Sequence, residues 1–345
     1  MKIRVFNPEH DLALAANLAN FTSPHAGRQL RADLGFIPAL WAETDDVVLV
    51  GDRDEAERKY RMLVKKPFGR FVTNNQLRAL PATGVDVWGW DLAIRAFLLR
   101  CGVSSHLLPS VEQIALIREL SHRRHSAKIL SQLQGENVIG EAAIITSFSE
   151  VLERIERVGT LVVKAPWSSS GRGVRFVEKS LNKSNEGWLR RIIDTQGAVM
   201  IEPYYNKVKD FGMEFSSDGQ GQITYLGLSL FQTSGGAYTG NVLASEEEKL
   251  EMIGHYIPVG LLTDVQQKIT ILTGKLYKDK YAGPFGVDMM VVAREDRKGF
   301  WLHPCVEINL RRTMGHVAIA LTGHLPVLPK IMTIQTDNLS YKICF

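Results

Sequence analysis

Short apolar runs alternate with helical patterns in the first third of the chain. Ile3 to Phe6, Val47 to Val50 and Val85 to Trp88 have the length of buried strands, and an amphipathic pattern over Leu92 to Leu99 follows the last of them. Asn7-Pro8-Glu9 comes after the first run and has the residues of a helix start, with Asn as the cap and Pro at the first helical position. This alternation predicts a small α/β domain with a mainly parallel sheet.

His10 and Asp11 stand at the first junction between strand and helix, where α/β sheets commonly bind ligands. Capping and compensation of the helix dipole by Asn7, Glu9 and Asp11 explain the same residues without a ligand. We favour the capping interpretation, because the pattern is that of an ordinary helix start.

The middle of the chain mixes helices with short strands. Ser110 and Gln113 have the spacing of a capping box and open helical segments that run through Leu133. The elements expected after these are Ser147–Val158 (helix), Leu161–Lys164 and Val174–Val177 (strands), a helical stretch near Trp188–Ile193, and the strand Ala198–Ile201. Together they predict a small α+β subdomain.

A loop rich in serine and glycine, Ser168 to Gly173, joins two of these strands. It lacks the lysine of a Walker A loop, and a strand rather than a helix follows it. Backbone N–H groups freed by Gly171 and Gly173 can form a concave anion-binding nest, to which the serine hydroxyls add donors. An ordinary hairpin tip explains this stretch equally well.

From about residue 206 the chain has the spacing of antiparallel strands and hairpins. Phe211–Phe215 and Ile223–Phe231 are candidate strands, and a second glycine-rich loop, Gln232–Asn241, follows them. Helices near 246–254 and 262–279 come before a final hairpin.

The final hairpin is expected to turn at Arg297-Lys298. This turn places Asp288 opposite Glu307. Because side chains alternate along a strand, Glu307, Asn309 and Arg311 should share one face.

This face has the chemistry of a metal and phosphate site. Two carboxylates that face each other on a sheet repel, so a cation should lie between them. Asp288, Glu307 and Asn309 offer hard oxygen donors, which suit Mg²⁺ or Mn²⁺ and do not suit zinc. Arg311 could hold a phosphate or a substrate carboxylate through two hydrogen bonds. A surface ion-pair network of Glu307 with Arg311 or Arg312 is the alternative; it explains the charges but not their regular spacing, and we favour the metal site.

Composition narrows the class of protein. The 345 residues are 45% hydrophobic and 23% charged, which is typical of a globular protein with room for two or three domains. A net charge of +4 with interspersed signs argues against nucleic-acid binding. The N-terminal segment is too polar for a signal peptide, and no apolar run is long enough to span a membrane. Three widely spaced cysteines fit a protein of the reducing cytoplasm.

In their order, the motifs LVVKAPWSSSGRGV, VMIEPYY, GVDMMVV and VEINLR resemble those of the ATP-grasp superfamily of carboxylate–amine ligases. The resemblance covers about residues 108–320, and no single motif is specific. It implies an α/β and α+β multidomain chain, with an N-terminal Rossmann-like α/β domain (1–107), a lid subdomain with the phosphate loop (108–205) and a C-terminal antiparallel β subdomain with the metal site (206–345).

The resemblance also implies a role for individual residues. Asp288, Glu307 and Asn309 would bind the metal, and Lys164 and Arg311 would be catalytic. The nucleotide would lie against Lys128, Lys164, Ser168, Ser169, Ser170, Gly171, Gly173, Glu202, Pro203, Tyr204 and Asp210. Some members of the superfamily have an arginine two residues before the first metal-binding acid, where this chain has Gly286.

The function implied by the resemblance is that of a ligase that uses ATP and Mg²⁺ (or Mn²⁺). It would activate a small carboxylate as an acylphosphate for attack by an amine or another nucleophile, and release ADP and phosphate. A kinase of the same fold acting on a small metabolite and a non-catalytic nucleotide sensor are the open alternatives. The expected partners are a small carboxylate and an amine, without nucleic acid or membrane, and the sequence allows a homodimer.

Overall fold

The computed structural model describes residues 1–168, 173–178, 181–234, 237–295, 298–325, 330–337 and 340–345. The chain divides into two compact units, each made of several segments. The first unit holds Met1–Arg118, Thr239–Glu246 and Leu310–Phe345, and the second holds Glu119–Tyr238 and Glu247–Asn309. The predicted division into three parts, with boundaries near residues 107 and 205, stays a prediction.

The first unit is built on a parallel sheet with the strand order β3-β2-β1-β4. Its strands are β1 (Lys2–Val5), β2 (Val47–Leu49), β3 (Arg70–Val72) and β4 (Gly84–Val87). The predicted strands and their parallel arrangement are confirmed. The sequence missed β3, because Arg70-Phe71-Val72 has only two apolar residues and forms no apolar run.

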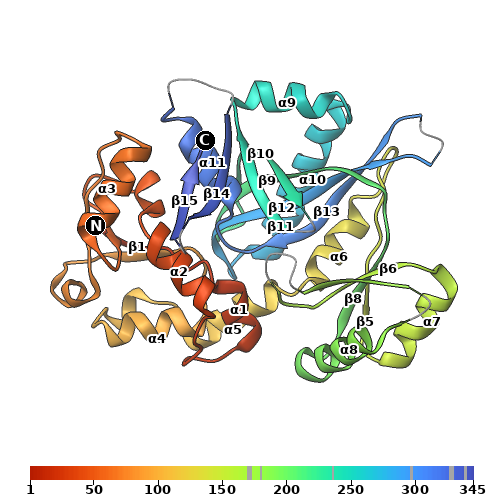
Figure 1. Cartoon of the computed structure of the whole chain (residues 1–345), viewed down its shortest axis with the longest axis horizontal. Coiled ribbons are helices and arrows are strands. Elements are labelled where there is room, and N and C mark those ends of the chain that lie inside the picture. The colour runs from red at the N-terminus through yellow and green to blue at the C-terminus, as the bar shows by residue number, and fades with distance from the viewer. Residues whose placement is uncertain (169–172, 179–180, 235–236, 296–297, 326–329, 338–339) are drawn as a thin grey trace. The chain divides into compact units, whose positions relative to one another are not determined.

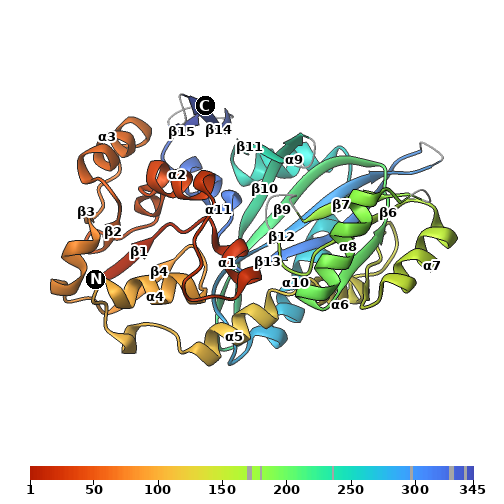
Figure 2. The same ribbon diagram turned by 60° about the horizontal axis from the view of Figure 1, so that its bottom comes forward.

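The strands of this sheet are apolar runs because both of its faces are covered. Val47 belongs to a core with Ile94 of α4, whereas the next residue, Val48, belongs to a second core with Tyr60 of α3. Figure 2 shows the four strands with these two helices around them. The helices of the first unit include α1 (His10–Ala16), α2 (His25–Leu34), α3 (Arg53–Leu63), α4 (Leu92–Arg100), α5 (Val111–Leu120), which begins in it, and α11 (Met314–Thr322), with 3₁₀ helices at Ile37–Leu40, Asn74–Ala79 and Ser105–Leu107.

The first helix begins later than predicted. α1 starts at His10, and Glu9 stands at its N-cap position without a capping hydrogen bond from its side chain. Asn7 instead donates from Nδ2 to the carbonyl oxygen of Gly89 at 2.8 Å and to Asp91 Oδ2 at 3.2 Å. The prediction that Asn7 caps this helix is therefore wrong: its side chain bonds the connection between β4 and α4.

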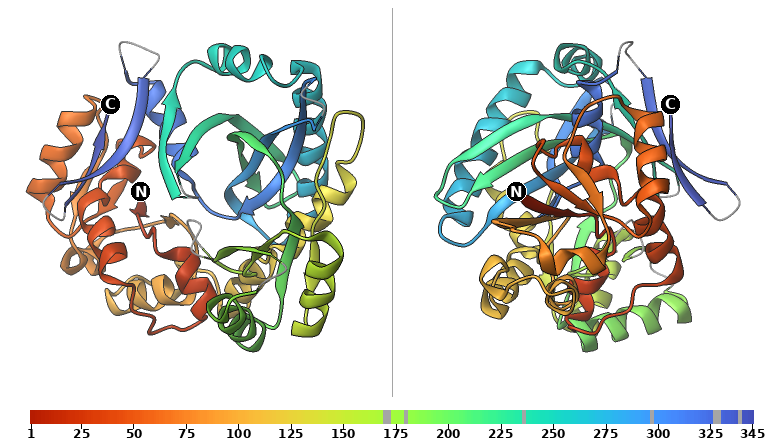
Figure 3. Two further views of the ribbon diagram at one scale, coloured as in Figure 1. Left: turned by 45° about the vertical axis from the view of Figure 1, so that its right-hand side comes forward. Right: turned by 90° about the vertical axis from the view of Figure 1, so that its left-hand side faces the viewer.

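Further strands of the first unit come from later in the chain. They are β11 (Ala237–Leu243), which belongs to this unit from Thr239 on, β14 (Lys330–Asp337) and β15 (Ser340–Cys344), and β14 pairs antiparallel with both of the others. β15 lies beside α2, where the backbone N–H of Tyr341 donates to Asp33 Oδ2 at 2.8 Å. Figure 3 shows this blue C-terminal hairpin next to the red and orange helices.

A small antiparallel sheet begins the second unit, with the strand order β5-β8-β6-β7. Val163 of the sheet packs with Val151 and Ile155 of one helix and Leu189 of another. The predicted strands and helices of this region are confirmed. Their bounds are β5 (Ala143–Ile145), α7 (Phe148–Val158), β6 (Leu161–Lys164), β7 (Val174–Val177), α8 (Lys183–Gln196) and β8 (Val199–Pro203).

A larger antiparallel sheet completes the second unit, with β13, β12, β9 and β10 side by side (Figure 1). Phe215 stacks on Phe285 at 5.2 Å between ring centroids, and Tyr277 of α10 meets Phe285 edge-on at 5.1 Å, so this helix covers the apolar face. The bounds are α6 (Arg124–Gln132), β9 (Lys207–Asp218), β10 (Ile223–Ser234), α9 (Glu246–Gly254), α10 (Val259–Tyr277), β12 (Ala282–Ala293) and β13 (Phe300–Asn309).

The second glycine-rich loop predicted over Gln232–Asn241 is largely strand. β10 continues to Ser234 and β11 begins at Ala237, while residues 235–236 lie outside the described residues. The prediction failed because glycine and serine are depleted in strands, although backbone pairing tolerates them here.

In the part of the chain that the structure describes, no helix is both long and apolar enough to cross a membrane. Cys101, Cys305 and Cys344 are all free thiols.

Candidate active site

The β12–β13 hairpin pairs Asp288 with Glu307, as the sequence predicted. Near the turn, Ala293 pairs with Phe300, whereas the expected register would pair it with Leu302. A bulge between Asp288 and Met290 absorbs the difference. The predicted pair is confirmed, whereas the register from which it was derived is wrong at the turn.

Asn309 lies next to this pair of carboxylates and donates from Nδ2 to Asp288 Oδ2 at 3.0 Å. The Glu307 side chain is 25% exposed. Two carboxylates and one amide at one end of a hairpin form the donor set that Mg²⁺ prefers, and they fit such an ion. Among the described residues no group of three or more His, Cys, Asp or Glu could hold a metal, so the rest of a metal's shell would come from the amide, water and a bound phosphate.

Arg123 is a residue of this site that the sequence analysis missed. It stands just before α6 and is buried. Its Nη2 contacts Glu307 Oε1 at 2.5 Å, and its Nη1 donates to Ser168 Oγ at 2.7 Å and to the carbonyl oxygen of Ala165. One guanidinium thus connects the candidate metal ligands to the first residue of the predicted phosphate loop.

Only part of that loop can be placed. Ser168 and Gly173 are described, and the carbonyl oxygen of Gly173 accepts from the N–H of Ala165 at 2.8 Å. Ser169, Ser170 and Gly171, which the resemblance assigns to the phosphates, lie outside the described residues. The anion-binding nest therefore stays a prediction.

Lys128, which the resemblance assigns to the nucleotide, is exposed on α6. The opposite side of this helix packs on β13, where Ser126 Oγ accepts from the N–H of Ile308 at 2.9 Å. Arg123 and Leu130 lie seven positions apart and are both buried, so the helical period held the signal that would have found Arg123.

Lys164 and Glu202 form a buried ion pair between neighbouring strands β6 and β8. Lys164 Nζ lies 2.7 Å from Glu202 Oε2, and both side chains are less than 10% exposed. Lys164 also donates to the carbonyl oxygen of Val306 at 3.4 Å, in β13. The structure therefore brings together two residues that the sequence placed separately on the nucleotide.

The remaining predicted nucleotide contacts lie just beyond this pair. Pro203 ends β8, and Tyr204 after it is 59% exposed, with its ring edge-on to Phe176 at 5.8 Å. Asp210 on β9 accepts from Lys207 Nζ and from Thr233 Oγ1, each at 2.6 Å. The nucleotide-binding roles of these three residues stay predictions.

A buried histidine lies behind the ion pair. His303 of β13 is fully buried, and burial, with the Lys164 charge as a second cause, lowers its pKa from 6.5 to about 3. Neither ring nitrogen has a hydrogen-bond partner among the described residues. Its ring meets Tyr205 at 5.6 Å, and burial raises the pKa of that phenol to about 12. Both groups are neutral at neutral pH.

Arg311 differs from the expectation. β13 ends at Asn309, so Arg311 does not lie on the strand, and the predicted face that it shares with Glu307 was wrong. It belongs to the first unit, where its Nε and Nη2 donate to Asp11 Oδ1 at 2.9 Å and Oδ2 at 2.7 Å. Asp11 therefore does more than compensate a helix dipole. The catalytic role of Arg311 stays a prediction.

The comparisons with known proteins concern the fold. No protein-family model matches the chain, and no curated protein matches its sequence. Among solved structures, it is similar to N5-carboxyaminoimidazole synthetase from Staphylococcus aureus complexed with ADP, at 14% identity over 97% of this chain and 82% of that one, with a TM-score of 0.50. It is also similar to a biotin carboxylase–β,γ-ATP complex from Campylobacter jejuni, at 13% identity over 99% of this chain and 73% of that one, with a TM-score of 0.50. Both are ATP-grasp enzymes, and the chain has the ATP-grasp fold.

Proposed function

We propose that the chain is an ATP- and Mg²⁺-dependent ligase. A small carboxylate takes the γ-phosphoryl group of ATP, which gives an acylphosphate and ADP. An amine or another nucleophile then attacks the acylphosphate and displaces phosphate. The observation that carries this proposal is the second unit's set of Asp288, Glu307 and Asn309 on one hairpin, with the cations Lys164 and Arg123 beside it. The ATP-grasp fold supports the proposal.

Each residue of this set has a part in binding the nucleotide. Asp288, Glu307 and Asn309 would hold the divalent ion, which when bound offsets the charge of phosphate oxygens. Lys164 would turn its ammonium from Glu202 to the phosphates, and Arg123 would steady Glu307 and Ser168. Because phosphoryl transfer needs little covalent chemistry from the protein, such positioning and charge supply most of the rate.

Product analysis tests the proposal directly. The protein is incubated with ATP, Mg²⁺ and pooled amino acids and small carboxylates, and the nucleotides and new adducts are then resolved. We expect ADP and phosphate whose formation depends on one acid and one amine. AMP with pyrophosphate would contradict the acylphosphate route.

Two variants locate the chemistry. Asp288→Asn combined with Glu307→Gln should abolish turnover, because the donor set loses both charges. Glu251→Gln on α9, an exposed carboxylate of the same unit, is the matched control and should keep full turnover. Equal turnover in all of these proteins would show that the site is misplaced.

The other functions have distinct outcomes in the same assay. A phosphorylated product formed without an amine would indicate a kinase. ATP binding without turnover, over a wide pool of acids and amines, would favour the nucleotide sensor.

A further inference from the structure

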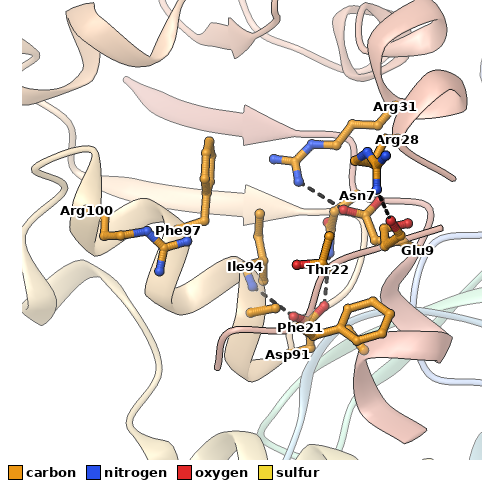
Figure 4. Close-up of a pocket in the computed structure, with 13 residues that line it drawn as sticks. Asn7, Glu9, Phe21, Thr22, Arg28, Arg31, Asp91, Ile94, Phe97 and Arg100 are labelled. Carbon is orange, nitrogen blue, oxygen red and sulfur yellow. Dashed lines mark hydrogen bonds and ion pairs between the residues drawn. The ribbon is translucent and has the colours of Figure 1, made fainter. Parts of the chain in front are cut away.

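A second candidate site lies entirely within the first unit. It is a cavity of about 320 Å³, within the size range of small-molecule sites, and it is bordered by α1, α2, α4 and the segment before α2 (Figure 4). Apolar side chains form much of its wall: Ala13, Phe21, Ala93, Ile94 and Phe97.

Three guanidinium groups and two carboxylates line this cavity. Arg31 pairs with Glu9 Oε1 at 2.9 Å. Both carboxylate oxygens of Asp91 already have partners in the protein. Oδ1 accepts from the N–H of Ile94 at 2.8 Å, and Oδ2 lies 3.1 Å from His10 Nδ1. The structure gives the other two arginines no carboxylate partner in the described part of the chain.

Those two arginines are Arg28 and Arg100. Figure 4 shows Arg28 on the same side of the pocket as Glu9 and Arg31, and Arg100 on the other side, with Ile94 and Phe97 between. The cavity therefore presents an excess of positive charge and an apolar wall beside it, which suits a small organic anion.

Glu9 indicates that the ligand of this cavity also carries a hydrogen-bond donor. Its Oε2 is buried and accepts no hydrogen bond from any described residue, although Oε1 is held by Arg31. A buried carboxylate oxygen without a donor is unfavourable, and a ligand that brings an N–H or ammonium group would satisfy it. The backbone next to Arg28 lies near Glu9, because a Cβ added at the neighbouring Gly27 would be 3.7 Å from Glu9 Cβ.

We propose that this cavity binds a free α-amino acid with an apolar side chain. Its carboxylate is held by Arg28, its ammonium by Glu9 Oε2, and its side chain lies against the apolar wall of the cavity. That the amino acid is one of the two substrates rests on the proposed ligase function, whereas its binding does not.

Calorimetric titration of the full-length protein without ATP tests this site. The probes are L-leucine and L-phenylalanine, with 4-methylpentanoate (no ammonium) and 3-methylbutylamine (no carboxylate) as analogues of leucine. We expect saturable binding of an amino acid and at least tenfold weaker binding of either analogue. Binding of 4-methylpentanoate as tight as that of leucine would overturn the role of Glu9.

Variants assign the two charges. Arg28→Ala should weaken binding at least tenfold, and Glu9→Gln should remove the preference for leucine over 4-methylpentanoate. Arg53→Ala, an exposed arginine at the start of α3, is the control and should bind as the native protein does. Unchanged binding in Arg28→Ala would overturn the proposal.

The results distinguish failure of the cavity proposal from failure of the proposed ligase function. If neither amino acid binds while the same preparation still binds a fluorescent ATP analogue, the cavity proposal fails and the ligase proposal stands. If an amino acid binds but no product forms from ATP with any acid and amine, the ligase proposal fails and the cavity proposal stands.

Discussion

The buried pair of Lys164 and Glu202 makes each residue depend on the other. Removing one partner leaves a charge in a site with little water, which typically destabilises a protein by about 3–5 kcal/mol. We therefore expect Lys164→Met to lower the free energy of unfolding by about 3 kcal/mol, measured by urea denaturation. Adding Glu202→Gln should recover part of this loss, because the uncompensated carboxylate is gone. A double variant less stable than Lys164→Met alone would contradict this account.

His303 should make the stability depend on pH below neutrality. Its native pKa of about 3 lies below the 6.5 of the unfolded chain, so the unfolded state takes up a proton as the pH falls below 6.5 and the native state does not. The stability contribution is constant above pH 6.5 and falls between pH 6.5 and 3. From pH 7.5 to 5 the loss is about 2 kcal/mol.

A substitution tests this dependence on pH. His303→Leu removes the titrating group, so its unfolding free energy should fall by about 2 kcal/mol less than that of the native protein over the same range. His255→Gln, which changes an exposed histidine after α9, should follow the native profile. Parallel profiles for the native protein and His303→Leu would show that His303 is not kept neutral.

At the scale of elements, the start of α5 offers a direct test of a helix cap. The N–H of Gln113 donates to Ser110 Oγ at 3.2 Å, and the N–H of Ser110 donates to Gln113 Oε1 at 2.7 Å. Ser110→Ala should lower the unfolding free energy by about 1 kcal/mol, while Ser110→Asp should stay close to the native value because aspartate also caps helices. The denaturation midpoints of the two variants measure this, and equal midpoints would argue against the cap.

Local patterns predicted most elements because their causes are local. The capping box at Ser110 and the apolar run of β6 both follow from neighbours in sequence. Asn7 shows the limit, since its partner is the carbonyl oxygen of Gly89 in another connection of the fold. The register error at the β12–β13 turn has the same origin, because a bulge leaves no mark in the alternation of a strand.

At the scale of the molecule, the units could not be read from the sequence because each core draws on distant segments. Phe6, Leu243, Val317 and Met332 share one core of the first unit. The candidate site was partly predictable: its carboxylates and Lys164 stand in motifs, whereas the contact of Arg123 with Glu307 depends on the packing of α6 against β13. The helical period indicates that Arg123 is buried, whereas its partner Glu307 follows only from tertiary structure.

A ligand that binds only the native state stabilises the protein, so ATP with Mg²⁺ should raise the unfolding temperature. At 100 times the dissociation constant the gain is about 2.7 kcal/mol, or about 5–10 °C for a unit of this size. Differential scanning calorimetry should show this shift in the native protein and in Glu251→Gln. In Asp288→Asn combined with Glu307→Gln, ATP should give the same shift with and without Mg²⁺, because the metal no longer contributes to binding. A shift that still depends on Mg²⁺ in that variant would mean that other residues hold the ion.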